Sequence, residues 1–164
     1  MLSGETSAGK YPIEAASFMR RTIIEAETAV RKRNLPLRDS PQFADIMADL
    51  AHRAADASGA KAIVVFTATG STARLIARYR SPVPIYAFSP SEAVARQLSV
   101  IYGANPIQAP DVSSTDEMVK LLDAKLLEIG ILRKGDTIVL VAGQPVGQPG
   151  STNLLKLHHI GELR

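Results

Sequence analysis

The sequence predicts a three-layer α/β/α domain built around a mostly parallel five-stranded sheet. Short apolar runs rich in β-branched residues recur after residue 62, and segments with helix-start signals separate them. Continuous apolar runs are typical of strands covered on both faces. Strands that alternate with helices usually pair in parallel, so this order predicts the fold class α/β.

Five segments are expected to form the strands of this sheet. They are residues 63–66, 85–88, 106–109, 137–142 and 153–159. The fourth has the strongest strand pattern, and the fifth has a weaker one that suits a sheet edge. Because the fifth follows the fourth after only a loop, we expect it to be antiparallel.

The helices between the strands carry explicit start signals. Ser89, Pro90 and Glu92 combine an N-cap serine, a proline at the first helical position and a glutamate placed for a capping box. Residues 114–117 repeat the capping-box arrangement, and Gly130 is placed to end that helix. These signals predict helices after the second and third strands.

The first sixty residues contain two helical patterns and no strong strand between them. Apolar residues recur there at three- and four-residue steps, which predicts one buried face for each helix. The first stripe is Ala16, Met19, Ile23, Ala26 and Val30. The second helix is expected to open at Ser40 and Pro41, to bury Phe43, Ile46, Leu50, Ala54 and Ala57, and to end at Gly59.

Composition excludes several classes of protein. Apolar residues make up 46% and charged residues 21%, as in globular proteins, and 19 Lys and Arg stand against 16 Asp and Glu. These charges are interspersed, so we expect no nucleic-acid partner. The absence of cysteine excludes disulfides and thiolate chemistry. We expect no membrane association and a cytoplasmic location, since no apolar run approaches ~18 residues and the N-terminus has no signal-peptide pattern.

The strongest candidate site is the turn between the first strand and the next helix. Ligands of parallel α/β sheets bind beyond the carboxyl ends of the strands. Hydroxyl groups can donate to phosphate oxygens, and a glycine lets the backbone approach closely. The expected phosphate-binding residues are Thr67, Thr69, Gly70, Ser71 and Thr72. The alternative is that Thr69 or Ser71 only caps the helix.

A second candidate segment is the loop of residues 143–152. It holds three glycines and two prolines and follows the fourth strand. At the same sheet edge it could cover a ligand held by the first turn, with Gly147, Gly150, Ser151 and Thr152 as the loop residues of the site. The alternative is a plain connection to the edge strand.

Nothing in the sequence predicts a metal centre or a catalytic nucleophile. His52 has no partner at metal-ligand spacing, and the adjacent His158 and His159 point to opposite faces of a strand. No serine has the context of a nucleophile elbow or a triad. The residues alone therefore predict a binding site without a catalytic centre.

Several segments together resemble the carboxy-terminal region of pyruvate kinase. The first of them, residues 2–6, is similar to the strand that closes the catalytic barrel in that family. The matches keep the family's order and span nearly the whole chain. The segments are residues 2–6, 9, 11–12, 14–15, 25–27, 77–80, 82, 84–85, 134–136 and 150–153.

The resemblance implies two parts of a longer enzyme. Residues 1–38 would be the end of the catalytic barrel and a linker, with a remnant barrel strand, and residues 39–164 would be the C-terminal allosteric and oligomerisation domain. Pyruvate kinase transfers phosphate from phosphoenolpyruvate to ADP, giving pyruvate and ATP, with magnesium and usually potassium. No catalytic or metal-binding residue of the family is expected in this chain. Ser3, Gly4, Glu5 and Thr6 would lie nearest the barrel mouth.

The resemblance also implies a phosphorylated effector and a tetramer. Relatives regulated by fructose bisphosphate carry a lysine and an arginine in the first turn, where this chain has Ala68 and Ser71. They carry an aromatic residue and an arginine in the covering loop, where this chain has Gln144, Val146 and Gln148. We therefore expect a monophosphate, such as AMP or a sugar monophosphate, in preference to fructose 1,6-bisphosphate. No cofactor is expected in the chain.

Two interpretations of the chain remain. One is a fragment of the enzyme, catalytically inactive alone, that carries the regulatory and tetramer-interface domain. The other is a free-standing regulatory module that binds phosphorylated metabolites, for which residues 2–6 would have no use. In the first case the apolar stripe of the first helix lacks the barrel it packs on, so we expect oligomerisation or rearrangement of the first thirty residues.

Overall fold

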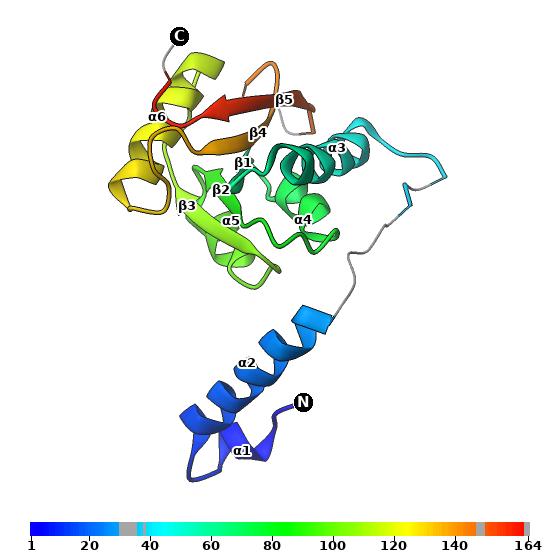
Figure 1. Ribbon diagram of the computed structural model, residues 1–164, viewed down its shortest axis with the longest axis vertical. Coiled ribbons are helices and arrows are strands. Elements are labelled where there is room, and N and C mark those ends of the chain that lie inside the picture. The colour runs from blue at the N-terminus through cyan, green and yellow to red at the C-terminus, as the bar shows by residue number, and fades with distance from the viewer. Residues whose placement is uncertain (30–35, 38, 147–149, 163–164) are drawn as a thin grey trace. The chain divides into compact units, whose positions relative to one another are not determined.

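The computed structural model describes residues 1–29, 36, 37, 39–146 and 150–162 (Figure 1). The chain divides into two compact units, Met1–Arg33 and Asn34–Arg164, which we describe separately. The expected boundary after residue 38 concerns the domains of a longer protein and stays a prediction.

The first unit begins with a helical turn where a barrel strand was expected. Helix α1 spans Gly4–Ser7 and helix α2 spans Pro12–Ala29. The hydroxyls of Thr6 and Ser7 donate to the carbonyl oxygen of Ser3, at 3.1 and 3.0 Å. A strand needs neighbouring strands for its backbone groups, and the described part of this unit offers none. The strand prediction for residues 2–6 is therefore wrong for this structure, and the turn satisfies its backbone locally.

Helix α2 leaves much of its apolar surface exposed within its unit. Ile13, Phe18 and Ile23 are 77%, 67% and 48% exposed. Met19 of the predicted stripe is only partly buried. Burying such side chains is worth ~1.5–3 kcal/mol each. A large apolar surface of this kind favours contact with a further polypeptide.

The second unit contains the predicted sheet, in the order β3-β2-β1-β4-β5. Its strands are β1 (Ala62–Phe66), β2 (Ile85–Ser89), β3 (Ala104–Gln108), β4 (Thr137–Gly143) and β5 (Thr152–His159). Strand β1 pairs in parallel with β2 and β4, and β2 pairs in parallel with β3. Strand β5 pairs antiparallel with β4. The α/β fold, the five strands and the antiparallel edge strand are thus confirmed.

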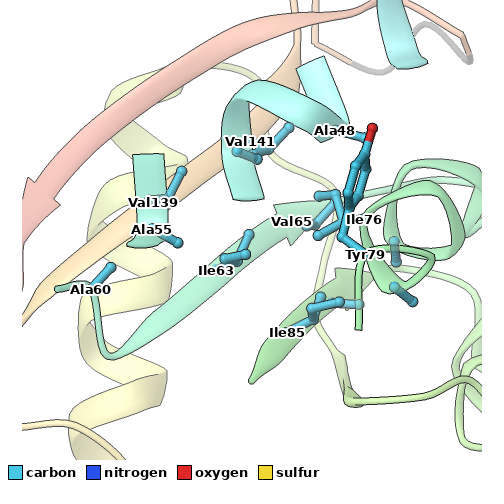
Figure 2. Packing of buried hydrophobic residues seen from close by; sticks show 14 of the residues in the cluster. Ala48, Ala55, Ala60, Ile63, Val65, Ile76, Tyr79, Ile85, Val139 and Val141 are labelled. Carbon is cyan, nitrogen blue, oxygen red and sulfur yellow. The ribbon is translucent and has the colours of Figure 1, made fainter. Parts of the chain in front are cut away.

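Helices cover both faces of this sheet, which gives the three predicted layers. Helices α3 (Phe43–Ser58), α4 (Ser71–Ala77) and α5 (Glu92–Leu98) pack on one face, where Ile63, Val65 and Val139 lie (Figure 2). Helix α6 (Thr115–Glu128) packs on the other face against Val64 and Leu140. Successive strand residues point to opposite faces, so the continuous apolar runs supply both cores.

Helix α3 buries a different face from the one its large side chains predict. Phe43 and Leu50 are 79% and 46% exposed, whereas Ala48, Ala51 and Ala55 are buried. Small side chains let a helix lie close to a sheet, and Ala48 and Ala55 belong to the core cluster drawn in Figure 2. The stripe prediction is therefore wrong for Phe43, Leu50 and Ala57, whereas Ile46 is partly buried and Ala54 packs against the core.

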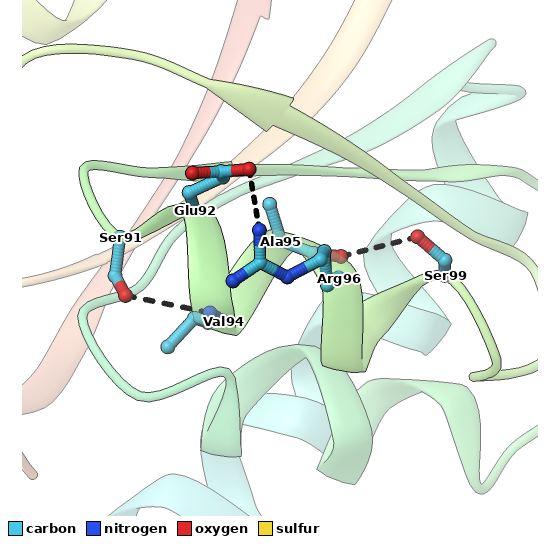
Figure 3. Close-up of polar contacts among 6 residues, drawn as sticks. All are labelled: Ser91, Glu92, Val94, Ala95, Arg96 and Ser99. Atoms are coloured by element: carbon cyan, nitrogen blue, oxygen red, sulfur yellow. Dashed lines mark hydrogen bonds and ion pairs between the residues drawn. The ribbon is translucent and has the colours of Figure 1, made fainter.

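Helix α5 starts later than its sequence signals predict. Ser91 is the N-cap, and its hydroxyl accepts a hydrogen bond from the backbone N–H of Val94 at 3.4 Å (Figure 3). Ser89, the predicted cap, is instead the last residue of β2 and pairs with Gln108 of β3. Backbone pairing of β2 with the edge strand β3 thus displaces the start of the helix by two residues. Figure 3 also shows the ion pair between Glu92 and Arg96 on the exposed side of α5.

A buried polar pair ties helix α6 to the edge strand. His158 Nε2 lies 2.9 Å from Asp123 Oδ1, with side chains 3% and 9% exposed. The other carboxylate oxygen of Asp123 accepts from the backbone N–H of Gly161 at 3.0 Å.

At the start of α6, hydrogen bonds from the backbone N–H and hydroxyl of Ser113 lower the pKa of Glu117. The predicted cap at Ser114 is confirmed, since its hydroxyl accepts from the N–H of Glu117.

Truncating a side chain of the central sheet tests this account of the core. Leu140 of β4 is fully buried, and Leu157 of β5 is 53% exposed. Leu140→Ala should lower the free energy of unfolding by about 2–5 kcal/mol through lost burial and a cavity. Leu157→Ala, the matched control, should cost less than about 1.5 kcal/mol, because half of its surface already contacts water. Urea unfolding followed by circular dichroism measures both; equal losses would contradict the layer assignment.

Candidate functional site

A cavity opens at the sheet edge where the parallel strands end. Its volume is about 80 Å³, several times the ~10–15 Å³ that one water molecule needs. The lining includes the end of β1 with the turn and helix start that follow it (residues 66–69, 71 and 72), the end of β2 with Pro90 (88–90), and the segment after β3 (109–112). Gly143 at the end of β4, Val146, residues 150–152 and Met118 of α6 complete it. The chain runs from β1 outward to β2 and β3, and then returns to β4 on the other side of β1. Ligands of open α/β sheets bind at such a reversal.

The turn after β1 is held in shape by its own hydroxyl groups. Thr67 Oγ1 accepts a hydrogen bond from the backbone N–H of Gly70 at 2.9 Å. Gly70 has a φ of 77° and is the N-cap of α4. A side chain there would also lie 3.1 Å from the buried Leu98, so glycine fits on both counts. Gly70 itself has no side chain to cap the helix, but Thr69 Oγ1 accepts from the backbone N–H of Ser71 at 3.4 Å. The alternative, in which Thr69 serves as a cap, therefore stands beside the prediction of phosphate binding.

Two hydrogen-bonded pairs of hydroxyl groups lie at the cavity. Thr72 Oγ1 and Thr152 Oγ1 lie 2.8 Å apart and are buried, and they join α4 to the start of β5. Thr69 Oγ1 lies 3.1 Å from Ser71 Oγ. A hydroxyl carries one proton and two lone pairs, so each pair uses one proton internally and keeps a second. Each pair can therefore present one donor to a ligand oxygen.

The loop after β4 is closed at its base by one side chain. Asn153 Oδ1 accepts from the backbone N–H of Gln144 at 2.8 Å, and Asn153 Nδ2 donates to the carbonyl of Gln144 at 2.7 Å. The Gln144 side chain donates to Thr115 Oγ1 of α6 at 2.6 Å. Gly143 packs so close to Ser151 that a Cβ would lie 2.2 Å from the serine hydroxyl. These contacts tie the two described ends of the loop to each other and to α6.

The structure brings the two predicted segments to one cavity. Thr67, Thr69, Ser71 and Thr72 line it, and so do Gly150, Ser151 and Thr152. Gly70 shapes the turn from outside the lining. Gly147 and Gln148 lie outside the described residues. Ser3, Gly4, Glu5 and Thr6 belong to the other unit and are described apart from this cavity.

Sequence reasoning missed the part of the cavity that follows β2 and β3. Ser89, Pro90, Asp111 and Val112 line it there. The signal was available, because the carboxyl ends of all parallel strands meet at one edge. Ser89 and Pro90 were read instead as a helix start.

The described lining of the cavity is almost free of charged side chains. Among the described lining residues Asp111 is the only charged one, and none is a lysine or arginine. Arg74 of α4 does not line the cavity. Its guanidinium donates to the carbonyl of Thr69 at 3.0 Å and to the side chain of Gln97 at 2.9 Å. The interior also has an aromatic wall, where Phe66 stacks on Phe88 with ring centroids 5.0 Å apart. The cavity thus offers hydroxyl donors, apolar surface and one carboxylate.

The described residues contain neither a metal-binding cluster nor a membrane-spanning helix. No group of three or more His, Asp or Glu side chains in them is placed to hold a metal ion. None of the described helices combines the length and the apolar character that crossing a membrane requires.

Comparison with known proteins identifies close relatives of the whole chain. The profile of the family described as "Pyruvate kinase, alpha/beta domain" matches residues 45–158. The chain is 38% identical to a pyruvate kinase of Geobacillus stearothermophilus and 39% identical to one of Staphylococcus epidermidis, each over 99% of this chain and 28% of the relative. It is 40% identical to a pyruvate kinase of Mycobacterium tuberculosis, over 99% of this chain and 34% of the relative. The chain therefore spans about a third or less of the length of these relatives.

Replacing Asn153 tests whether it holds the loop after β4. Asn153→Ala removes both contacts with the backbone of Gln144 and should cost about 1–2 kcal/mol of unfolding free energy. Amide hydrogen exchange should accelerate at Gln144 and Ser151. Asn153→Asp keeps the acceptor and loses the donor, so its effect should be intermediate.

The matched control is Lys156→Ala, which removes an exposed side chain from the same strand. It should leave the exchange rates of the loop unchanged. Unchanged exchange in Asn153→Ala would show that the loop is held by other contacts.

Proposed function

Since the chain belongs to the pyruvate kinase family, we propose that it forms the regulatory C-terminal part of such an enzyme. The reaction of the whole enzyme is phosphoryl transfer from phosphoenolpyruvate to ADP, giving pyruvate and ATP in glycolysis. The observation that carries the regulatory role is the cavity at the sheet edge. It brings together the two hydroxyl-bearing segments that are predicted to hold a phosphate.

The ligand proposed for this cavity is a phosphorylated metabolite that acts as an allosteric effector. The hydroxyls of Ser71 and of the Thr72–Thr152 pair stand at the turn and can donate to phosphate oxygens. Hydrogen bonds to a charged group contribute roughly 1.5–3 kcal/mol each. A few of them suffice to hold one phosphate without a cation.

A monophosphate fits this cavity better than fructose 1,6-bisphosphate. A second phosphate needs cationic partners to replace its hydration, and bidentate arginine contacts are the usual supply. The described lining has neither arginine nor lysine. Its apolar and aromatic wall instead suits the uncharged part of a ligand such as AMP or a sugar monophosphate.

The chemistry of the whole enzyme is proposed to take place outside this chain. Magnesium and potassium serve that reaction in the family, and the described residues form no acidic or histidine cluster that fits a metal ion. We therefore assign neither ion to this chain. By itself the polypeptide should be inactive, and as part of a glycolytic enzyme it would be cytoplasmic.

The exposed face of α2 supports a place within a larger assembly. Ile13, Phe18 and Ile23 offer apolar surface that a barrel or another subunit would cover. We propose a homotetramer for the parent enzyme. A free-standing regulatory module would have the same cavity but no use for this apolar face, so the face favours the first interpretation.

Calorimetry against AMP, fructose 6-phosphate and fructose 1,6-bisphosphate tests the effector site. At least one of the two monophosphates should bind with a lower dissociation constant than fructose 1,6-bisphosphate. Ser71→Ala removes a proposed donor to phosphate and should weaken binding by roughly tenfold or more, as a loss of 1.5–3 kcal/mol implies.

Ser99→Ala is the matched control, because its hydroxyl donates to the carbonyl of Ala95 away from the cavity. It should leave affinity unchanged. Tight binding of the bisphosphate with no binding of a monophosphate would reverse the proposed preference.

A coupled assay tests the proposed inactivity of the chain. With phosphoenolpyruvate, ADP, magnesium and potassium present, formation of pyruvate should not exceed the rate without protein. A full-length pyruvate kinase in the same buffer is the positive control. Turnover well above background would show that this polypeptide contains a catalytic centre.

A further inference from the structure

Asp111 places a negative charge in a cavity proposed to bind an anion. It follows β3 and lines the cavity together with the turn after β1. Strand β3 is separated from β1 by β2. Neighbouring strands lie about 4.8 Å apart, so the ends of β1 and β3 are roughly 10 Å apart along the sheet edge. That span is comparable to the length of a hexose that carries a phosphate at one end.

A carboxylate on the β3 side of the cavity discriminates among ligands that share the same first phosphate. Ionised carboxylates only accept hydrogen bonds, and in dinucleotide-binding folds an acidic residue binds ribose hydroxyls in this way. A ligand with hydroxyl groups at its far end satisfies Asp111. A ligand with a second phosphate there meets a like charge, and the described lining holds no cation to offset it.

We propose that Asp111 is the specificity-determining residue that restricts this cavity to ligands with a single phosphate. It accepts hydrogen bonds from hydroxyl groups at the end of the ligand away from residues 67–72. It repels a second phosphate at that end. This inference rests on the proposed function, because it assumes that the cavity binds phosphorylated metabolites.

A matched pair of ligands and a matched pair of variants test the role of Asp111. Fructose 6-phosphate and fructose 1,6-bisphosphate differ by one phosphate, and inorganic phosphate reports on the turn alone. Asp111→Asn removes the charge and keeps the shape of the side chain. Asp116→Asn makes the same change of net charge on an exposed residue of α6 that does not line the cavity. Isothermal calorimetry on the full chain measures the three affinities for each protein.

The wild-type chain should bind the bisphosphate more weakly than the monophosphate. Asp111→Asn should reduce this ratio of dissociation constants by about tenfold, which corresponds to removal of about 1.4 kcal/mol of charge repulsion. Its affinity for inorganic phosphate should stay within about twofold of wild type, a difference of about 0.4 kcal/mol. Asp116→Asn should leave the ratio unchanged.

Two results would overturn the inference, and they are distinguishable. If the wild-type chain binds the monophosphate and Asp111→Asn keeps the wild-type ratio, the effector site stands and the role of Asp111 is wrong. If the folded wild-type chain binds none of the three ligands, the proposed function itself fails and the inference fails with it. A thermal melt of each variant without ligand confirms that it is folded.

Discussion

The parallel pairing of β1 with both β2 and β4 is the constraint on which the rest of this structure depends. Parallel pairing forces each connection among β1, β2, β3 and β4 to cross a face of the sheet, and it brings the carboxyl ends of these four strands to one side of the sheet. The reversal of strand order beside β1 then leaves room between the loops after β1 and β4. The cavity is a consequence of this topology, and the hydroxyl-bearing residues occupy a place that the backbone has already provided.

The proposed specificity of this cavity depends on the hydroxyl groups of its described lining and on the absence of lysine and arginine from that lining. Hydroxyl pairs such as Thr72 and Thr152 bridge α4 to β5 and still retain a proton for a ligand. Arg74 is engaged with the carbonyl of Thr69 and does not line the cavity. The proposed site therefore offers a ligand short, uncharged donors, which favours a ligand of low charge. The role proposed for Asp111 at the β3 side of the cavity has the same direction.

Much of this architecture could be predicted from the sequence, and the exceptions have physical causes. The runs that form β1, β2 and β4 are continuous and β-branched, so their places and parallel pairing followed from pattern alone. The turn at Thr67 and the loop ending at Thr152 were predicted to meet, because strand ends share an edge. Asp111 was missed because one carboxylate in a loop has no pattern. Ser89 was predicted to cap α5, but it belongs to β2, because backbone pairing with Gln108 of β3 outweighs the local capping signal.

The most direct test asks which residues respond when phosphate binds at the cavity beside the reversal of strand order. Inorganic phosphate can be titrated into the isotope-labelled chain while backbone amide resonances are followed by nuclear magnetic resonance. The largest shifts should be confined to the amides of residues 67–72 and of Ser151 and Thr152, with saturation that yields one dissociation constant. Shifts spread over exposed lysines and arginines elsewhere, or no saturable shifts in these two segments, would contradict the central claim.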